Sequence, residues 1–385
     1  MRIIRFALRA LLVLALLAGG LALWKREEIT RLLAVNSLFA PEKIVANFSG
    51  MDRLFLTRPL DIGTEAATPL PEGAPVALPQ GVATWAAARN VTALVVLKDG
   101  ALVHESYYLG TDAQDLRISW SVAKSFLSAL FGILHDEGTI PDLEAQVVSL
   151  APTLRGTAYD GATLRDVLTM SSGVAFNEDY LDYDSDINRM GRVLALGGSM
   201  DGFAAGLQLR DADPGARMHY VSIDTHVLGM VIAGATGRDP AELLAERVLQ
   251  PLGLERTPYY LTDGEGTAFV LGGLNLTTRD YARFGQLFLQ GGVWQGRQVV
   301  PAAWVAQSTA LQAPGGAGYG FQWWVPTDSA AHGNDYFARG IYGQYVYINP
   351  ARGVVVAVNA ADTGFEEPGV DAENLAQLRV IAAGV

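Results

Sequence analysis

Two short apolar runs near the start of the folded region have the length of β-strands. Residues 92–97 and 101–107 are rich in apolar side chains, and Asp99-Gly100 joins them. Asp-Gly between two such runs is a strong signal for the two-residue turn of a β-hairpin. The pattern therefore predicts an antiparallel pair of strands here.

Three more apolar runs of strand length lie near the end of the chain, at residues 319–325, 345–348 and 354–358. The last two flank residues 350–353, where proline and glycine interrupt the pattern. This arrangement predicts three strands, the last two of which form a second hairpin.

Between these strand regions the pattern is helical. Residues 121–137 are apolar on nearly every face, which indicates a buried helix, and Gly138 followed by Pro141 ends it. Residues 142–265 are mostly helix and loop. Strands at both ends with helices between them predict an α+β fold, in which both ends build one sheet and a mainly helical lobe is inserted.

The first 24 residues differ from the rest of the chain. Residues 10–24 carry no charge, and Arg2, Arg5 and Arg9 precede them. This run suits the apolar core of a signal peptide and is short for a membrane span of about 20 residues, although Arg9 can reach the membrane surface and lengthen the span. We expect an uncleaved signal anchor or a cleaved signal peptide over residues 1–24; a buried globular helix is the remaining alternative.

Positive charge before an apolar segment stays in the cytoplasm. We therefore expect the remainder of the chain to be exported and held at the membrane through its N-terminal segment, on the periplasmic or extracellular side. Residues 25–80 start amphipathic and end rich in proline, which predicts an N-terminal arm. Residues 81–385 then form the folded domain.

Composition limits the partners and the chemistry. Half of the 385 residues are apolar, and the formal charge of −12 with a pI near 4.9 argues against a nucleic-acid partner. The absence of cysteine excludes disulfides, thiol catalysis and thiolate zinc sites. The five histidines lack a metal-binding spacing, so we expect no metal and no cofactor.

Candidate chemistry lies at the start of the buried helix. Ser121 and Lys124 form a Ser-x-x-Lys sequence, and residues three apart on a helix share a face, so that the hydroxyl and the amine can meet. A helix start also offers free N–H groups, which makes the backbone N–H of Ser121 a candidate oxyanion donor. We therefore predict that Ser121 is a nucleophile and Lys124 its base.

A Ser-x-x-Lys sequence also occurs by chance in a chain of this length. Two observations favour catalysis. Only four of the 28 basic residues are lysines, so a chain that otherwise uses arginine carries at Lys124 the one cation that readily loses its proton. The helix is also apolar, where an ammonium group is costly unless it is partnered or neutral. No Gly-x-Ser-x-Gly sequence offers a competing nucleophile.

An acidic segment raises a metal-binding alternative. Asp182, Asp184 and Asp186 alternate as in a calcium loop, but the glycine and the final glutamate of such a loop are missing. Together with Glu178 and Asp179, they are interpreted as a solvated acidic loop.

The chain resembles the β-lactamase-related serine hydrolases, which include class C β-lactamases, penicillin-binding proteins and esterases. Within them it is most similar to the 6-aminohexanoate-dimer hydrolase branch. The similarity covers about residues 85–385 and implies a β-lactamase-like fold. It rests on seven segments in order: SWSVAKSF (119–126), TLRDVLTMSSGV (163–174), MHYVSIDTHVLG (218–229), PLGLERT (251–257), GGLNLTTRDYARFGQLFLQGG (272–292), GYGFQWW (318–324) and GIYGQYVYINP (340–350).

The resemblance assigns roles to individual residues. Ser121 matches the nucleophile and Lys124 its base. In a Tyr-x-Ser motif, Tyr220 would relay a proton to the leaving group and Ser222 would hold Lys124. Ile341 would give the second oxyanion N–H. The alternative for Tyr220 is a core tyrosine with one hydrogen bond.

The resemblance also concerns substrate contacts. Tyr180 matches a loop tyrosine that touches substrate in the amide-hydrolase branch, and Trp120 and Tyr342 are candidates for lining an acyl pocket. Arg339 falls where many relatives have Lys-Thr-Gly or His-x-Gly. Without Lys-Thr-Gly the usual carboxylate anchor of β-lactam recognition is missing, and Arg339 is either its replacement or a surface residue.

We therefore expect a serine hydrolase that cleaves an ester or amide bond of a small-molecule substrate through an acyl-enzyme on Ser121. The closest alternative is a D,D-peptidase or β-lactamase that acts on peptidoglycan peptides or β-lactams. A catalytically silent, membrane-tethered binding protein is an alternative of another class, and the intact Ser-x-x-Lys and Tyr-x-Ser sequences argue against it.

Overall fold

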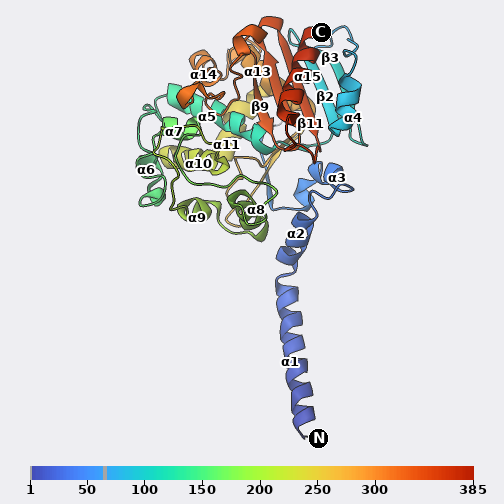
Figure 1. The fold of residues 1–385 in the computed structure, drawn as a ribbon, viewed down its shortest axis with the longest axis vertical. Helices are drawn as coiled ribbons and strands as arrows, with labels where there is room; N and C mark the ends of the chain where they lie inside the picture. Colours follow the sequence, from blue (N-terminus) through green and yellow to red (C-terminus); the bar gives the residue numbers. More distant parts are fainter. Residues whose placement is uncertain (1, 64–66) are drawn as a thin grey trace.

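In the computed structural model, which describes residues 2–63 and 67–385, strands from both ends of the folded domain join in one antiparallel sheet (Figure 1). Met1 and residues 64–66 lie outside the described residues. The sheet has the order β3-β2-β11-β10-β9, and its strands are β2 (Val91–Lys98), β3 (Ala101–Tyr107), β9 (Tyr336–Gly340), β10 (Gln344–Asn349) and β11 (Val354–Ala360). Both predicted hairpins are present, and the predicted α+β fold is confirmed.

Strand β11 alternates its side chains between two layers of helices. Val356 packs with α4 and α15 on one face of the sheet, and Val355 faces α13 on the other. A β-carbon at Gly285 of α13 would lie only 2.5 Å from Val355, so glycine lets this helix lie close to the sheet. Helix α5 packs behind α13 through the stacked rings of Phe126 and Phe284, 3.6 Å apart. These helices are α4 (Val82–Ala88), α5 (Ala123–Asp136), α13 (Thr278–Leu289) and α15 (Val370–Gly384).

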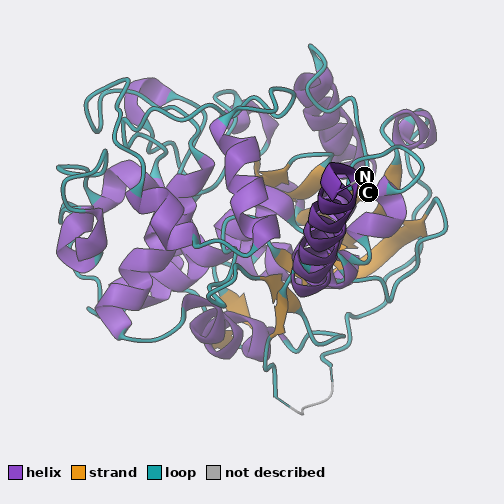
Figure 2. Ribbon diagram, turned by 90° about the horizontal axis from the view of Figure 1, so that it is seen from below, coloured by secondary structure: helices purple, strands orange, loops and turns teal. Residues whose placement is uncertain are grey.

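A helical lobe lies beside the sheet, and Figure 2 shows the strands on one side and the lobe on the other. Its buried centre is α10, which packs against α5, α6, α7 and α9. The lobe holds α6 (Val147–Leu150), α7 (Leu164–Leu168), α8 (Asp186–Leu196), α9 (Met200–Ala205), α10 (Ser222–Thr236), α11 (Pro240–Leu244) and α12 (Gln250–Leu252). The mainly helical character predicted for residues 142–265 is confirmed.

A second sheet of very short strands ties the N-terminal arm to the domain. Its order is β1-β5-β6-β4, with β1 (Thr57–Pro59), β4 (Arg117–Ile118), β5 (Tyr259–Leu261) and β6 (Leu274–Leu276). Strands of two or three residues carry no readable alternation, so the sequence pattern did not predict this sheet. Strand β4 leads directly toward the predicted nucleophile. A small hairpin of β7 (Val293–Trp294) and β8 (Arg297–Gln298) precedes α14 (Ala302–Ser308).

The strand predicted over residues 319–325 is wrong. The segment makes only isolated bridges and turns back on itself, with Gln322 at φ +64° and the N–H of Gly320 donating to the carbonyl of Trp323. The hydroxyls of Ser125 and Ser128 on α5 donate to carbonyls of this segment at 2.7 Å. Those carbonyls therefore accept hydrogen bonds from side chains and not from a neighbouring strand. The apolar side chains of the segment still pack in the core.

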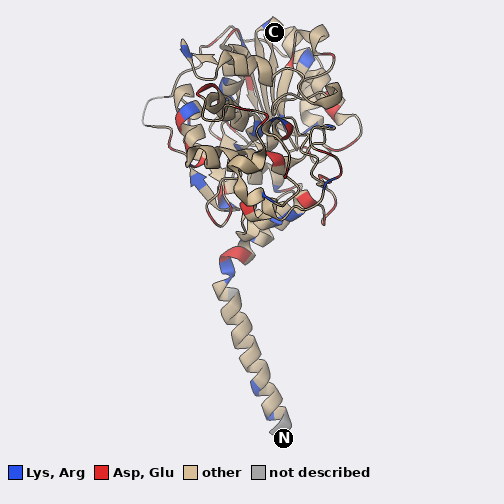
Figure 3. Cartoon of the chain, turned by 90° about the vertical axis from the view of Figure 1, so that its left-hand side faces the viewer, with Lys and Arg blue, Asp and Glu red and all other residues tan. Residues whose placement is uncertain are grey.

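Helix α1 (Arg2–Trp24) extends away from the domain, and α2 (Arg26–Asn36) follows it after one residue (Figures 1 and 3). The segment Ile4–Leu21 has a mean hydropathy of 2.0 and is not buried, so this helix is long and apolar enough to cross a membrane. A signal sequence near an N-terminus has the same properties. The membrane anchor and the export of the domain therefore stay predictions. Farther along the arm lies α3 (Ile44–Phe48).

Candidate active site

Ser121 lies on a short turn between β4 and α5. The predicted helix is present as a 3₁₀ turn, Trp120–Val122, that continues into α5. Trp120 has φ +42°, a left-handed conformation that a side chain of this size rarely adopts, and the N–H of Ser119 anchors the turn on the carbonyl of Leu274 at 2.8 Å. Strained backbone of this kind persists where the surrounding structure holds it, often at functional sites.

The end of strand β9 lies directly against this turn. A β-carbon at Gly340 would lie 2.6 Å from the carbonyl oxygen of Ser119 and 3.0 Å from the backbone nitrogen of Ser121. Only glycine allows this approach, which brings the following residue, Ile341, next to the Ser121 turn. Tyr342 then continues with φ +60°. The two residues predicted to supply oxyanion N–H groups, Ser121 and Ile341, are thus neighbours in space.

The amine of Lys124 is buried and held in place. The side chain is 1 % exposed, and Nζ donates to the carbonyl of Leu271 at 3.1 Å and to the hydroxyl of Ser222 at 3.4 Å. Nζ also lies 5.5 Å from the centre of the Tyr220 ring. Burial lowers the pKa of Lys124 to about 7, against the opposing effect of the Glu178 carboxylate. A neutral amine is therefore available near neutral pH.

Tyr220 packs among aromatic rings beside the predicted nucleophile. Its ring stacks on Trp324 at 5.5 Å and meets the edge of Tyr319 at 6.1 Å. Burial raises the pKa of the Tyr220 phenol well above its ordinary value, against the opposing effect of a hydrogen bond from Ser121. The phenol therefore keeps its proton at neutral pH and can act as an acid.

Glu178 belongs to the site, and its interpretation as part of a solvated loop is wrong. Its carboxylate accepts hydrogen bonds from the backbone N–H of Ser222 and from the hydroxyl of Tyr180, the latter at 3.0 Å. Ser222 is the first residue of α10, so its N–H has no acceptor within the helix and is available to Glu178. A negative charge at the first turn of a helix is electrostatically favourable. Burial raises the pKa of Glu178, and the nearby Lys124 opposes this rise. The signal in the sequence was alternation: Phe176, Glu178 and Tyr180 occupy every second position, as on one side of an extended segment.

Three of the other acidic residues of this segment hold the loop itself. The carboxylates of Asp179, Asp182 and Asp186 accept hydrogen bonds from backbone N–H groups of their own loop, at 2.8 to 3.2 Å. Among the residues that the structure describes, no group of acidic or histidine side chains could hold a metal ion.

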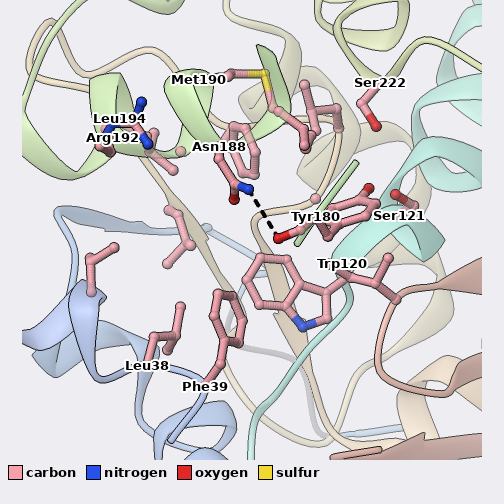
Figure 4. A pocket seen from close by; sticks show the side chains of 18 of the residues that line it. Leu38, Phe39, Trp120, Ser121, Tyr180, Asn188, Met190, Arg192, Leu194 and Ser222 are labelled. Atoms are coloured by element: carbon pink, nitrogen blue, oxygen red, sulfur yellow. Dashed lines mark hydrogen bonds between the residues drawn. The ribbon is translucent and has the colours of Figure 1, made fainter. Parts of the chain in front are cut away.

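Two cavities meet at Ser121, which lines both. The first has a volume of about 310 Å³ and is mostly apolar (Figure 4). Three of the predicted substrate contacts, Trp120, Tyr180 and Tyr342, line it. Residues of α8 and of the N-terminal arm also line it, among them Met190 and Leu194, and Leu38 and Phe39.

The second cavity has a volume of about 510 Å³ and a more polar lining than the first, with Glu178, Tyr220 and Arg339 among its residues; we call it the polar cavity. The guanidinium of Arg339 is ion-paired with Asp371 of α15 and lies 4.3 Å from the ring of Trp324. Its charge is therefore already partnered. Its predicted contact with substrate stays a prediction.

The arm residues in the first cavity were not predicted from the sequence. Phe39 stacks on Tyr342 at 4.7 Å, and Phe48 meets the edge of Trp120 at 5.6 Å. Leu38 is buried beside them. No local pattern could have found these contacts, because they join segments that lie far apart in the chain.

Comparisons with known proteins give the family context of this site. The family model described as beta-lactamase matches residues 80–380. The chain is 30% identical to the 6-aminohexanoate-dimer hydrolase of Paenarthrobacter ureafaciens over 282 aligned residues. The aligned region covers 69% of this chain and 71% of that protein.

Solved structures share the fold. A provisionally named 6-aminohexanoate-dimer hydrolase from Bacillus anthracis superposes with a TM-score of 0.77 at 24% identity, over 89% of this chain and 95% of that one. A D-stereospecific amidohydrolase from a Streptomyces species superposes with a TM-score of 0.59 at 20% identity, over 80% and 98% of the two chains. At these identities the likeness concerns the β-lactamase-like fold.

Proposed function

Because the chain belongs to the β-lactamase family and is a serine hydrolase homologous to 6-aminohexanoate-dimer hydrolases, we propose that it cleaves an ester or amide bond through an acyl-enzyme on Ser121. The observation that carries the proposal is the buried amine of Lys124, three residues after Ser121, whose pKa burial lowers to about 7. An amine in this state can accept the proton of a neighbouring hydroxyl.

In the acylation step, the Ser121 hydroxyl transfers its proton to Nζ of Lys124 while its oxygen attacks the substrate carbonyl carbon. The carbonyl oxygen becomes an oxyanion between the N–H groups of Ser121 and Ile341. The approach of Gly340 to the Ser121 turn supports this pairing, because it fixes the two backbone segments against each other.

Collapse of the tetrahedral intermediate breaks the bond to the leaving group. The Tyr220 hydroxyl donates its proton to the departing oxygen or nitrogen, and the Lys124 ammonium restores the proton to the phenol. Water then attacks the acyl carbon, with its proton taken by the same groups, and Ser121 leaves as the free hydroxyl with release of the acid. Burial keeps the Tyr220 phenol protonated, as this role requires, and its place in the cavity beside Ser121 supports the assignment.

The polar cavity beside Tyr220 is the proposed site of the leaving group. Glu178, Glu366 and Glu367 line it, whereas its arginine, Arg339, is ion-paired with Asp371. This balance favours a neutral or amine-bearing leaving group and disfavours a free carboxylate. It therefore favours ester or amide hydrolysis over β-lactam hydrolysis, because a β-lactam antibiotic carries a carboxylate on that side.

The location of the enzyme is part of the proposal. The exposed apolar helix α1 and the arginines at its start support an anchor that holds the domain at the outer face of a membrane. A cleaved signal peptide would export the same domain without a tether.

Labelling with a fluorophosphonate tests the proposal directly, because this probe reacts with an activated serine. The wild-type protein should gain the mass of one phosphonyl group, and Ser121→Ala should gain none. Ser119→Ala is the matched control, since this serine lies two residues away and should leave labelling intact. Labelling of Ser121→Ala would refute the assignment of the nucleophile.

A further inference from the structure

The N-terminal arm forms one wall of the apolar cavity beside Ser121. Val35 at the end of α2 and Leu38 and Phe39 just after it line the cavity. The arm is fixed there, because Arg31 of α2 donates to the carbonyl of Ala195 on α8 at 3.2 Å. The cavity is therefore complete only when the arm is docked.

The same arm continues into the apolar helix. Only Lys25 separates α1 from α2, and α2 has 11 residues, or about 16 Å of helix. Figure 1 shows α1, α2 and α8 on the same side of the molecule. The wall of the cavity is thus one short helix away from a segment that is apolar enough to lie in a bilayer.

Large apolar side chains are exposed at the rim of the cavity, among the acidic residues of the same loop. Leu181 and Tyr183 both line the cavity, yet they are 82% and 67% exposed. On α2, Leu33 is 63% exposed. Large exposed apolar side chains around a pocket mark a surface that meets an apolar phase or partner.

The chemistry decides which part of a substrate this cavity takes. Tyr220, the proposed acid for the leaving group, lines the polar cavity and not the apolar one. The leaving group therefore lies on the polar side of Ser121, and the acyl group lies on the apolar side. A volume of about 310 Å³ is at the lower end of the range of about 300–1,000 Å³ typical of ligand pockets.

We propose that the apolar cavity takes a long acyl chain delivered from the bilayer, so that the substrate is a membrane-resident acyl ester or amide with a neutral or amine-bearing head group. This inference rests on the proposed acyl-enzyme mechanism. The bond from the acyl carbon to Ser121 Oγ forms first, and the acyl C–O or C–N bond then breaks as the head group leaves with a proton from Tyr220. Water finally releases the fatty acid.

The test uses the full-length protein in phosphatidylcholine vesicles. Its kcat/KM is compared for p-nitrophenyl dodecanoate and p-nitrophenyl acetate. Each buried methylene can contribute up to about fourfold, so the ratio should favour dodecanoate by at least about tenfold. The rate should also follow the mole fraction of dodecanoate in the bilayer and not its bulk concentration.

Gly191 on α8 offers a way to fill the cavity. It lines the cavity, and a β-carbon at this position would meet nothing within 4 Å. Gly191→Phe should lower the dodecanoate-to-acetate ratio by about tenfold or more. Arg189→Phe places the same ring on the exposed outer face of α8 and should keep the wild-type ratio.

The outcomes separate the two proposals. Acetate hydrolysis without a preference for dodecanoate, or rates that follow the bulk concentration, would overturn the long-chain inference and leave the proposed function standing. Failure to hydrolyse either ester together with no fluorophosphonate labelling would refute both. Labelling rates for a dodecyl and an ethyl fluorophosphonate give the chain-length comparison without a substitution, and equal rates would contradict the inference.

Discussion

The backbone N–H of Ser222 donates a hydrogen bond to the carboxylate of Glu178. The hydroxyl of the same serine accepts a hydrogen bond from Nζ of Lys124 at 3.4 Å. Glu178 thus fixes the residue that orients the proposed base, and its charge also acts on the Lys124 amine. We therefore regard Glu178 as a positioning residue for Lys124.

Glu178→Gln should change the pH dependence of the enzyme as well as its rate. The carboxylate raises the pKa of Lys124 against the effect of burial, so its removal should lower that pKa. Because the active form of Lys124 is neutral, the rising limb of kcat/KM should move to lower pH. We expect kcat to fall by about tenfold from the loss of orientation.

The control for Glu178→Gln is Asp179→Asn, which removes a charge from the next residue. The Asp179 carboxylate accepts hydrogen bonds within its own loop, so this variant should keep the wild-type pH profile. A uniform loss of rate in Glu178→Gln with an unmoved pH profile would indicate a purely structural role.

For the wild-type enzyme, kcat/KM should rise with pH through an apparent pKa of about 7, as Lys124 loses its proton. The raised pKa of Tyr220 keeps the phenol protonated far above this range, so the profile should reach a plateau on the alkaline side. The measurement uses p-nitrophenyl acetate between about pH 5 and 9 with correction for spontaneous hydrolysis. A flat profile across neutrality would contradict the assignment of Lys124 as base.

Lys124→Arg should fold but lose about 10³-fold or more in kcat/KM, because guanidinium stays protonated in proteins. Lys124→Met should be equally inactive and more stable than the wild type at low pH. The folded-state pKa of Lys124 is lowered from 10.5 to about 7, so the folded protein bears the cost of a buried charge below pH 7. That cost is relieved as the pH rises from about 7 toward 10.5.

Two measurements check the Lys124 variants. Initial rates on an activated ester test the chemistry, and thermal melts across this pH range test the stability. The gain in melting temperature for Lys124→Met should shrink as the pH rises. Near-native activity in a folded Lys124→Arg enzyme would refute the mechanism.

How much of this site the sequence can predict depends on how far apart its parts lie in the chain. Ser121 and Lys124 lie on one helical face, so local periodicity alone brings them together. Glu178 was not predicted because its acidic neighbours suggest a solvated loop, although only Glu178 turns toward Ser222. Leu38 and Phe39 could not be predicted, since their place in the cavity depends on how the arm docks across the domain.

The fold shows the same division. The Asp-Gly turn and the apolar runs beside it predicted the β2–β3 hairpin correctly, because the signal and the structure are both local. The run over residues 319–325 has the apolar content of a strand, but hydroxyls of Ser125 and Ser128 on α5 bind its carbonyls. These hydrogen bonds come from a helix far away in the sequence, so the local pattern of residues 319–325 could not predict them.

Tyr220→Phe removes the proposed acid and keeps the ring that stacks on Trp324. Amide hydrolysis needs a proton on the leaving nitrogen, so its rate should fall by about 10² to 10⁴. The loss should be smaller for a p-nitrophenyl ester, whose leaving group departs readily without a proton. The control is Tyr319→Phe, a buried tyrosine at the edge of the same ring. Equal losses on the two substrates would argue against proton transfer by Tyr220.

The ion pair between Arg339 and Asp371 should set the response to carboxylate-bearing substrates. With its charge partnered, Arg339 is a poor anchor for the carboxylate of a β-lactam, so turnover of nitrocefin by the wild type should be weak. Asp371→Asn should release the guanidinium and raise kcat/KM for nitrocefin by about tenfold, since a charge-assisted hydrogen bond contributes about 1.5–3 kcal/mol. The activity on p-nitrophenyl acetate, which has no carboxylate, should not rise with it.

Glu373→Gln removes a charge from the same helix, but from a residue paired with Arg89, and should leave nitrocefin turnover at the wild-type level. Efficient nitrocefin hydrolysis by the wild type would favour the β-lactamase alternative, and an unchanged Asp371→Asn would show that Arg339 does not contact the leaving-group side of the substrate.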